Sequence, residues 1–439
     1  MKVLKFGGTS MGTASRIKDV AKLINDGNRK IVVLSAMSGT TNSLIEIADY
    51  FYKNNASGAL EKTNLLERKY IEVINDIFEK EEFANKTKEV VHGIFDYIRS
   101  FSKSVFTIFE EKAILAQGEL LSTNMFQFHL EEQGISSVLI PALDFMRIDK
   151  NAEPDIAFIS ENLKRVLKEV PKVDIYVTQG YICRNFYGEI DNLQRGGSDY
   201  TASLIGAAIK AKEIQIWTDI DGMHNNDPRY VENTRPVPML NFDEAAELAY
   251  FGAKILHPTC ILPAKLNNIP VRLLNTMDPK SHGTLISNKS IKGVIEAIAA
   301  KDGITAIKIK SGRMLLAHGF LRKVFEIFET HRTSIDMITT SEVGVSVTID
   351  NNRRLAEIVN DLKKFGTVTV DEDMVIVCVV GDMPYEQVGF QAKIVSALKD
   401  IPIRMISYGG SNYNVSILVS QEDKKKTLNA LSDAIFNTN

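Results

Sequence analysis

Short β-branched segments alternate with longer helical patterns from the N-terminus to about residue 295, and this alternation limits the fold more than any other feature of the sequence. Strands joined by helices pair in parallel, so the alternation predicts an α/β domain in which helices cover a mostly parallel sheet. The predicted strands are residues 2–6, 31–35, 137–141, 174–179, 214–218 and 270–274.

Between residues 41 and 133 the sequence has helical periodicity and no strand pattern. Part of this region is an apolar stripe with three- and four-residue spacing, formed by Ile94, Phe95, Ile98, Phe101, Val105 and Ile108. Such a stripe predicts a helix face packed into the core rather than a cofactor contact. Farther along, residues 181–195 predict an antiparallel hairpin that interrupts the parallel order.

After residue 290 the pattern changes to short strands and short helices, and the sequence repeats internally. Each copy predicts a helix, a strand, a turn and a strand, and further strand patterns lie at 305–310 and 374–380. The tail is therefore predicted to form two small βαββαβ modules, and doubled modules behind an enzyme-sized domain indicate regulation. The repeated pieces are Gly319-Phe320 with Gly389-Phe390, residues 335–338 with 403–406, and residues 345–347 with 415–417.

Charge and cysteine usage exclude several classes of protein. The chain has 52 Lys and Arg against 55 Asp and Glu, a net charge of −3, which disfavours a basic nucleic-acid binder. Cys183, Cys260 and Cys378 are too far apart for a CxxC zinc or disulfide motif. No apolar run approaches about 18 residues, and the first ten residues lack the apolar stretch of a signal peptide. We expect a cytoplasmic protein without a membrane or nucleic-acid partner.

Three glycine turns open predicted helices. Residues 5–10 (KFGGTS) follow the first strand, residues 35–41 (SAMSGTT) follow the second, and residues 195–199 (RGGSD) precede another helix. Backbone N–H groups at such helix starts bind phosphate, and ligands of open α/β sheets lie outside the carboxyl ends of the strands. Each turn alone is also compatible with a plain tight turn, but together they predict an electropositive pocket for a polyphosphate.

Three charged positions each have a structural and a ligand interpretation. Asp219 follows the strand at 214–218 and could equally cap a turn. Glu119 lies in a largely apolar helix, so it should reach solvent or pair with a buried cation. Lys254 could meet phosphate or cap the C-terminus of a helix. His257 has no HxxH or HExxH partner, so metal ligation is not predicted.

Residues 5–10, 195–199 and 251–258 (FGAKILHP), taken together and in this order, closely resemble the aspartate kinases. The resemblance covers essentially the whole chain, and the repeated tail is similar to the paired ACT modules of that family. It implies an amino-acid kinase fold, a three-layer α/β/α sandwich, over residues 1–293. It also implies a regulatory region over residues 294–439, with a first ferredoxin-like ACT module at roughly 311–381 and a second made of 294–310 and 382–439.

The activity that the resemblance implies is transfer of the γ-phosphoryl group of ATP to the β-carboxylate of L-aspartate. A carboxylate is already ionised at pH 7, so no general base is needed, and catalysis depends on positioning and charge neutralisation. Magnesium is expected with ATP, held mainly by phosphate oxygens and water, with no metal site on the protein. The alternatives are another amino-acid kinase with a glutamate-type substrate and a non-catalytic amino-acid sensor.

The resemblance also implies roles for individual residues. Lys5 and Asp199 are the implied catalytic residues. The implied aspartate site is Thr41, Glu119, Arg195, Gly197 and Ser198, and the implied nucleotide site is Gly7, Gly8, Ser38, Gly39, Thr218, Asp219, Arg229 and Lys254. The implied site for feedback inhibition by L-lysine is Met314, Gly319, Phe320, Leu321, Ser334, Asp336, Ser341, Glu342 and Val343. This effector is expected at or near an interface between tail modules of a homodimer or tetramer.

Overall fold

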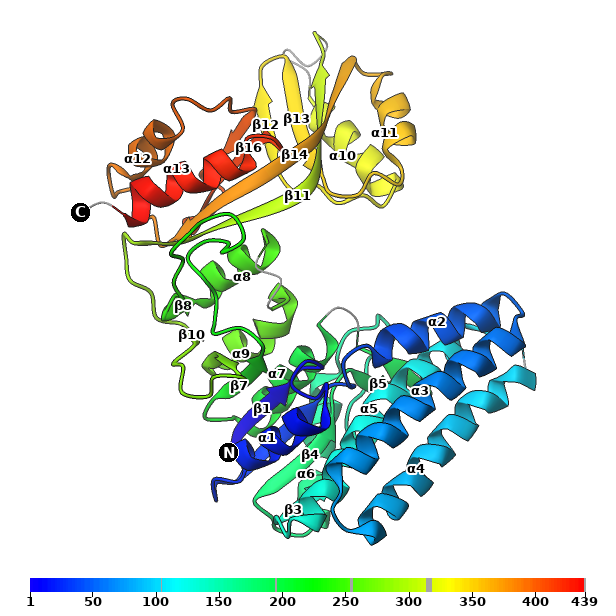
Figure 1. Cartoon of the computed structure of the whole chain (residues 1–439). Coiled ribbons are helices and arrows are strands. Elements are labelled where there is room, and N and C mark those ends of the chain that lie inside the picture. Colours follow the sequence, from blue (N-terminus) through cyan, green and yellow to red (C-terminus); the bar gives the residue numbers. More distant parts are fainter. Residues whose placement is uncertain (104, 194–195, 253–255, 313–317, 438–439) are drawn as a thin grey trace. The chain divides into compact units, whose positions relative to one another are not determined.

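The computed structural model describes residues 1–103, 105–193, 196–252, 256–312 and 318–437. The chain forms two compact units, one of residues 1–223 and 256–288, the other of residues 224–255 and 289–439 (Figure 1). Residues 224–255 thus pack with the tail. Within the described residues, no helix combines the length and the apolar character needed to cross a membrane.

The first unit is built on a mostly parallel sheet. Among the seven strands that this unit contributes to the sheet, neighbours pair in parallel except β9 and β10, which are antiparallel. The six predicted strands are confirmed to within two residues at each end, whereas β10 was not predicted. The strand order is β3 (Ser137–Leu139), β4 (Ile175–Gln179), β2 (Lys30–Leu34), β1 (Lys2–Phe6), β7 (Ile214–Thr218), β9 (Val271–Asn275) and β10 (Thr284–Ser287).

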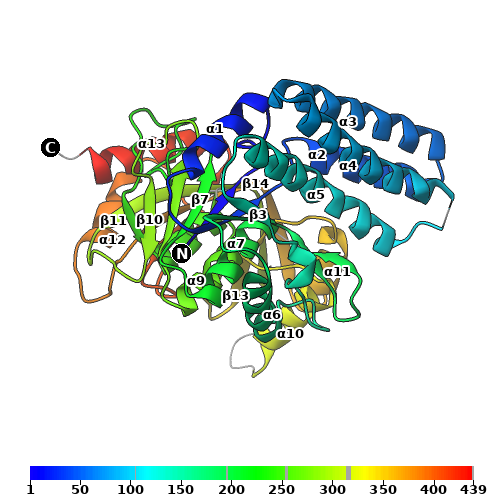
Figure 2. The ribbon, with the colours of Figure 1, turned by 90° about the horizontal axis from the view of Figure 1, so that it is seen from below.

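Helices cover both faces of this sheet (Figure 2). Leu4, Phe6, Val32 and Leu34 alternate along β1 and β2 and join one large core with the helices of residues 14–132. Helix α7 packs on the other face, against β1, β2 and β7. The helices are α1 (Ala14–Ile24), α2 (Thr40–Tyr52), α3 (Ala56–Ile77), α4 (Glu81–Ser100), α5 (Ile108–Glu132), α6 (Ile156–Glu169), α7 (Gly197–Ile209) and α9 (Leu262–Leu266).

The predicted hairpin is confirmed, because β5 (Ile182–Arg184) and β6 (Ile190–Asn192) pair antiparallel. The predicted apolar stripe is only partly correct. Phe95 and Ile98 are fully buried, but Val105 and Ile108 are 83% and 49% exposed. The physical reason is that α4 ends at Ser100 and α5 begins at Ile108, so one helical period does not run through these positions.

The second unit contains an antiparallel sheet and the helices α8 (Phe242–Tyr250), α10 (Phe320–Thr330), α11 (Leu355–Leu362), α12 (Phe390–Ala397) and α13 (Lys424–Phe436). A short strand, β8 (Met239–Asn241), precedes α8. The sheet order is β12 (Ile338–Ser341), β13 (Gly344–Ile349), β11 (Ile295–Lys310), β14 (Thr367–Gly381), β16 (Asn414–Ser420) and β15 (Met405–Ser407).

The internal repeat of the sequence is confirmed in this unit. Gly319 and Gly389, both at positive φ, each immediately precede a helix, α10 and α12, and two strands follow each helix. The long strands β11 and β14 run through both copies. One core joins Ile307 and Val347 to α10 and α11, and a second joins Val377 and Ile417 to α12 and α13. The tail therefore forms two similar α/β modules that share one continuous sheet.

A prediction for stability concerns Gly283, which precedes β10 with φ +61; a Cβ there would lie 1.8 Å from the Leu273 carbonyl oxygen. Gly134 has a similar φ of +66, but a Cβ there would meet nothing within 4 Å. We expect Gly134→Ala to lower the free energy of unfolding by about 1 kcal/mol through backbone strain alone. Gly283→Ala should lower it by about 3 kcal/mol or more, because the added methyl group clashes with backbone.

The measurement is urea denaturation followed by the fluorescence of Trp217, the single tryptophan, which lies in the same unit as both glycines. Equal losses for the two variants would show that the backbone around Gly283 can relax.

Candidate functional site

An ion pair between Lys5 and Asp199 lies at the carboxyl end of the parallel sheet. The Lys5 Nζ is 2.8 Å from the Asp199 Oδ1, and the side chains are only 13% and 14% exposed. Lys5 belongs to β1 and Asp199 to the first turn of α7. A lysine ammonium has three donors, so Lys5 can be held by Asp199 and still donate to an anion.

Two glycine turns meet beside this ion pair. The Gly7 N–H donates to the Trp217 carbonyl at 3.2 Å, and the Ser38 N–H donates to the Gly8 carbonyl at 3.1 Å. A Cβ at Gly8 would be 3.0 Å from the Ala36 carbonyl oxygen, so the two loops pack too closely for a larger residue. Two of the N–H groups predicted to face a ligand are therefore bonded within the protein, since that of Ser38 joins the two loops and that of Gly7 extends the pairing of β1 with β7.

Two of the helices that follow the glycine turns, α2 and α7, begin without side-chain caps, whereas the Thr13 hydroxyl caps α1 by accepting from the Arg16 N–H. Gly39 precedes α2 with φ +82 and Gly196 precedes α7 with φ +71, and neither helix start has a side-chain acceptor. The positive end of each helix dipole is then available to an anion. A Cβ at Gly196 would lie 2.3 Å from the Cys260 Sγ, so this turn also requires glycine.

Glu119 is a buried carboxylate on α5, only 4% exposed. Its Oε1 accepts from the Ala36 N–H at 3.2 Å, and within the described parts of the chain its Oε2 has no hydrogen-bond partner. Burial raises the pKa of Glu119 to about 8, although the Ala36 N–H and the charge of Lys5 act in the opposite direction. The sequence predicted that this side chain would reach solvent or pair with a cation. The structure shows neither, and leaves a buried oxygen that can accept from a cationic ligand.

The other predicted substrate and nucleotide residues have different surroundings. Thr41 lies in the first turn of α2, and Ser198 lies in the first turn of α7. Ser198 packs against Gly180, because a Cβ added at Gly180 would lie 2.5 Å from the Ser198 Cβ. The Thr218 hydroxyl accepts from the Asp219 N–H at 2.6 Å at the end of β7.

Arg229 belongs to the second unit, where it pairs with Asp227. Arg195, Lys254 and Met314 lie outside the described residues.

A cleft of about 460 Å³ opens in the first unit between α5, the β5–β6 hairpin and the start of α7. The predicted residue Gly197 lines it, together with Gly196. The Lys112 Nζ, which also lines the cleft, donates to the Asp191 Oδ2 at 2.6 Å. The hairpin itself was predicted from sequence, but its role in forming a cleft was not.

Two residues of α3 support the site and were missed from the sequence. The Lys69 Nζ donates to the Ser38 carbonyl at 2.9 Å, and the buried Tyr70 hydroxyl is 2.9 Å from the Thr40 Oγ1. Nothing in the helical pattern of residues 56–77 marks these positions, because the contacts exist only once α3 packs beside α2.

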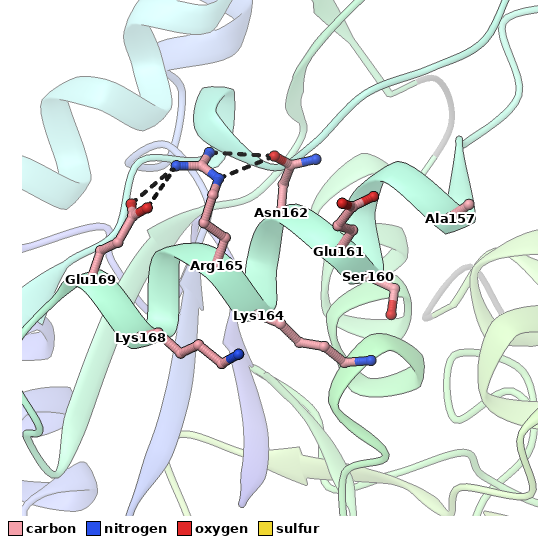
Figure 3. A pocket seen from close by; sticks show the side chains of 8 residues that line it. All are labelled: Ala157, Ser160, Glu161, Asn162, Lys164, Arg165, Lys168 and Glu169. Atoms are coloured by element: carbon pink, nitrogen blue, oxygen red, sulfur yellow. Dashed lines mark hydrogen bonds and ion pairs between the residues drawn. The ribbon is translucent and has the colours of Figure 1, made fainter.

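A second hollow runs along α6 (Figure 3). All its lining residues belong to this one helix, and its Arg165 side chain donates to Glu169 at 3.0 Å and to Asn162. Among the described residues, no predicted site residue lines it and no buried polar groups converge there, so it lacks the features of a binding site. In the described parts of the chain, no three His, Cys, Asp or Glu side chains are grouped to hold a metal ion.

The predicted effector residues lie in the first tail module. Phe320 is part of its core, whereas Leu321 is 38% exposed. Ser341 is the exposed last residue of β12, and Glu342 and Val343 form the exposed turn that leads to β13. Asp336 is the buried charge of the set, with a side chain that is 1% exposed. Ser334 lies two residues before it in the segment between α10 and β12.

Comparisons with known proteins match the chain along its length. The model of the amino acid kinase family matches residues 1–275, and that of an ACT domain matches residues 377–435. The lysine-sensitive aspartokinase 3 of Escherichia coli is 32% identical over 464 residues, covering 99% of both chains.

Two solved structures of E. coli aspartokinase III are similar to this chain. The complex with aspartate and ADP has a TM-score of 0.83 at 31% identity, covering 99% of this chain and 100% of that one. The complex with lysine and aspartate has a TM-score of 0.80 at 31% identity, covering 99% of both.

The raised pKa of Glu119 leads to a prediction about stability and pH. The folded protein favours the protonated carboxyl up to about pH 8, whereas the unfolded chain ionises near its usual value of 4.5. The contribution of the neutral Glu119 carboxyl to the free energy of unfolding is thus fully present below pH 4.5 and is lost as the pH rises to 8. Glu119→Gln cannot ionise, so its melting temperature should exceed that of the native protein by a margin that grows from pH 5 to pH 8 and is then constant.

The measurement is thermal unfolding across this pH range, with the exposed Glu89→Gln as the matched control. A difference in melting temperature between Glu119→Gln and the native protein that stays the same from pH 5 to pH 8 would contradict the raised pKa.

Proposed function

This chain belongs to the amino acid kinase family and, within it, to the aspartokinases, and from that premise we propose that it phosphorylates the β-carboxylate of L-aspartate with ATP. The products are 4-phospho-L-aspartate and ADP, so the reaction is the first step of lysine, threonine and methionine biosynthesis. The observation that carries the proposal is the buried Lys5–Asp199 ion pair beside the glycine turns. E. coli aspartokinase III, which has a similar fold, binds aspartate and ADP.

Lys5 would contact the β- and γ-phosphates, with Asp199 holding its ammonium in place. Because the Gly7 and Ser38 N–H groups are already bonded within the protein, Gly8 and Gly39 are the candidate backbone donors to phosphate. The uncapped start of α2 adds its dipole to the same region. These fixed positive groups would stabilise the charge that develops on the transferring phosphoryl group.

Glu119 would accept the α-ammonium of aspartate through its unpartnered Oε2. Arg195 would hold the α-carboxylate bidentately, and Thr41, Gly197 and Ser198 would complete the pocket. The bound ammonium would compensate the buried charge, so aspartate binding would favour the ionised form of Glu119. The cleft between α5 and the β5–β6 hairpin, which reaches Gly197, supports this position for the amino acid.

The chemical step needs no base on the protein. The aspartate β-carboxylate is ionised at neutral pH and attacks the γ-phosphorus, and the bond to the β–γ bridging oxygen breaks to release ADP. The protein contributes by orienting the carboxylate and neutralising charge. Magnesium would supply further charge neutralisation on the phosphates, held by phosphate oxygens and water. Thr218, Asp219, Arg229 and Lys254 are proposed for the nucleotide side.

Regulation by L-lysine is the second part of the proposal. E. coli aspartokinase III also binds lysine and aspartate together in a T-state, and the tail modules of this chain carry the predicted effector residues. We assign residues 1–293 to catalysis and 294–439 to regulation, although residues 224–255 pack with the tail. A cytoplasmic homodimer or tetramer formed through the ACT modules completes the proposal.

The test of function is ATP-dependent formation of an acyl phosphate, trapped with hydroxylamine as a hydroxamate. We expect hydroxamate with L-aspartate, none with L-glutamate or an acylated glutamate, and suppression by millimolar L-lysine. Hydroxamate with a glutamate-type substrate alone would indicate a different amino-acid kinase. No hydroxamate with any of these substrates would indicate an amino-acid sensor.

Lys5→Ala should lower kcat about a thousandfold, because it removes a charge that meets the transferring phosphoryl group. The matched control is Lys2→Ala on the same strand, whose side chain is 51% exposed and pairs with Glu213. Both variants are compared for hydroxamate formation and for melting temperature. A near-native kcat for a folded Lys5→Ala protein would remove Lys5 from the mechanism.

A further inference from the structure

A cluster of charged groups surrounds the buried side chain of Asp336 in the second unit. The Asp336 Oδ1 accepts from the Tyr250 hydroxyl at 2.6 Å and from the Lys301 Nζ at 2.7 Å. Its other oxygen, Oδ2, is buried and has no hydrogen-bond partner among the residues that the structure describes. A buried carboxylate oxygen without a donor costs free energy, so this position favours a ligand that brings one.

The charges of the cluster favour a cationic ligand. The Lys301 Nζ also lies 2.9 Å from the Asp350 Oδ2, and it sits 4.3 Å from the centre of the Tyr250 ring. Burial and the neighbouring Asp336 carboxylate raise the pKa of Tyr250 to about 12, so its hydroxyl stays protonated and donates. Two carboxylates and one ammonium therefore leave a net charge of −1, which one further ammonium would neutralise.

The cluster joins three separate segments of the chain. Asp336 precedes β12, Lys301 lies on β11 beside the register shift between Lys301 and Ile304, and Tyr250 is the last residue of α8. The chain just after α8 is tightly packed on β11, because a Cβ at Gly252 would lie 2.3 Å from the Ala300 carbonyl oxygen. Residues 251–258, the motif that contains Lys254, follow Tyr250 directly in the sequence.

Building on the proposed inhibition by lysine, we propose that Tyr250 is the positioning residue that couples the effector site to the kinase. An effector ammonium that binds the Asp336 Oδ2 draws negative charge away from Oδ1 and competes with the donors already there. The Tyr250 hydrogen bond weakens, and the end of α8, from which the chain continues to residues 256–288 of the first unit, is released from the Asp336 loop. Effector binding and kinase activity are then linked through one hydroxyl group.

Tyr250→Phe is the informative variant, since it keeps the ring beside Lys301 and removes only the hydroxyl. Tyr250 is 43% exposed, so the change leaves no cavity. Tyr408→Phe is the matched control, because Tyr408 is also 43% exposed in the same unit and its hydroxyl accepts from Gln391 instead. Asp336→Ala removes the proposed ammonium acceptor itself.

The experiment uses the full chain and three readouts: calorimetric binding of L-lysine, hydrogen exchange of residues 242–252 with and without L-lysine, and the hydroxamate assay. We expect lysine to bind the native protein and to speed exchange in this segment. Tyr250→Phe should bind lysine within about threefold of the native affinity, lose the exchange response, and retain at least fivefold more activity at saturating lysine. Tyr408→Phe should behave as the native protein, and Asp336→Ala should lose lysine binding.

Two results for Tyr250→Phe would overturn the proposal. If lysine inhibits Tyr250→Phe as strongly as the native protein and changes its hydrogen exchange equally, the hydroxyl does not couple lysine binding to kinase activity. If Tyr250→Phe no longer binds lysine, Tyr250 is part of the binding site. Failure of the native protein to bind lysine would also overturn it, while leaving the kinase activity in place. Absence of hydroxamate from the native protein would refute the proposed activity alone, because binding and exchange are measured without turnover.

Discussion

The ion pair between Lys5 and Asp199 is the contact on which the rest of the first unit depends. Both side chains are largely withdrawn from water, so either charge alone would be poorly solvated. Their pairing requires α7 to begin beside the end of β1, which in turn lies between β2 and β7. The same arrangement brings the glycine turns to one edge of the sheet. The fold thus places fixed positive charge where a parallel sheet ordinarily binds its ligand.

The two modules of the tail are joined by shared strands. The strands β11 and β14 pass through both modules, and each module packs its own helices on its own part of these strands. The pairing of β11 with β14 shifts register between Lys301 and Ala306, between these two cores. Lys301 is therefore located where the modules meet, and its partner Asp336 belongs to the first of them. A change in this ion pair would act on both modules together.

The sequence predicted the features that depend on local pattern. The buried strands and the repeat around Gly319 and Gly389 are each encoded within a few neighbouring residues, and the structure confirms them. Contacts between distant segments were not predictable in the same way. Lys69, Tyr250 and Lys301 acquire their partners only through tertiary packing, and Val105 was wrongly assigned to the core because the end of a helix was missed. The roles of the site residues remain predictions.

Glu119 and Asp336, which are proposed to bind the ammonium groups of the substrate and the effector, share one structural feature. Each is a buried carboxylate with one oxygen bonded within the protein and one oxygen that has no partner in the part of the chain that the structure describes. Aspartate and lysine both carry an ammonium group that could supply the missing donor. The two carboxylates differ in the position of the nearest lysine. Lys301 forms an ion pair with Asp336 directly. Lys5 is paired with Asp199 and acts on Glu119 only through its charge. Substrate binding would therefore compensate a buried charge, whereas effector binding would have to compete with a lysine side chain that is already present.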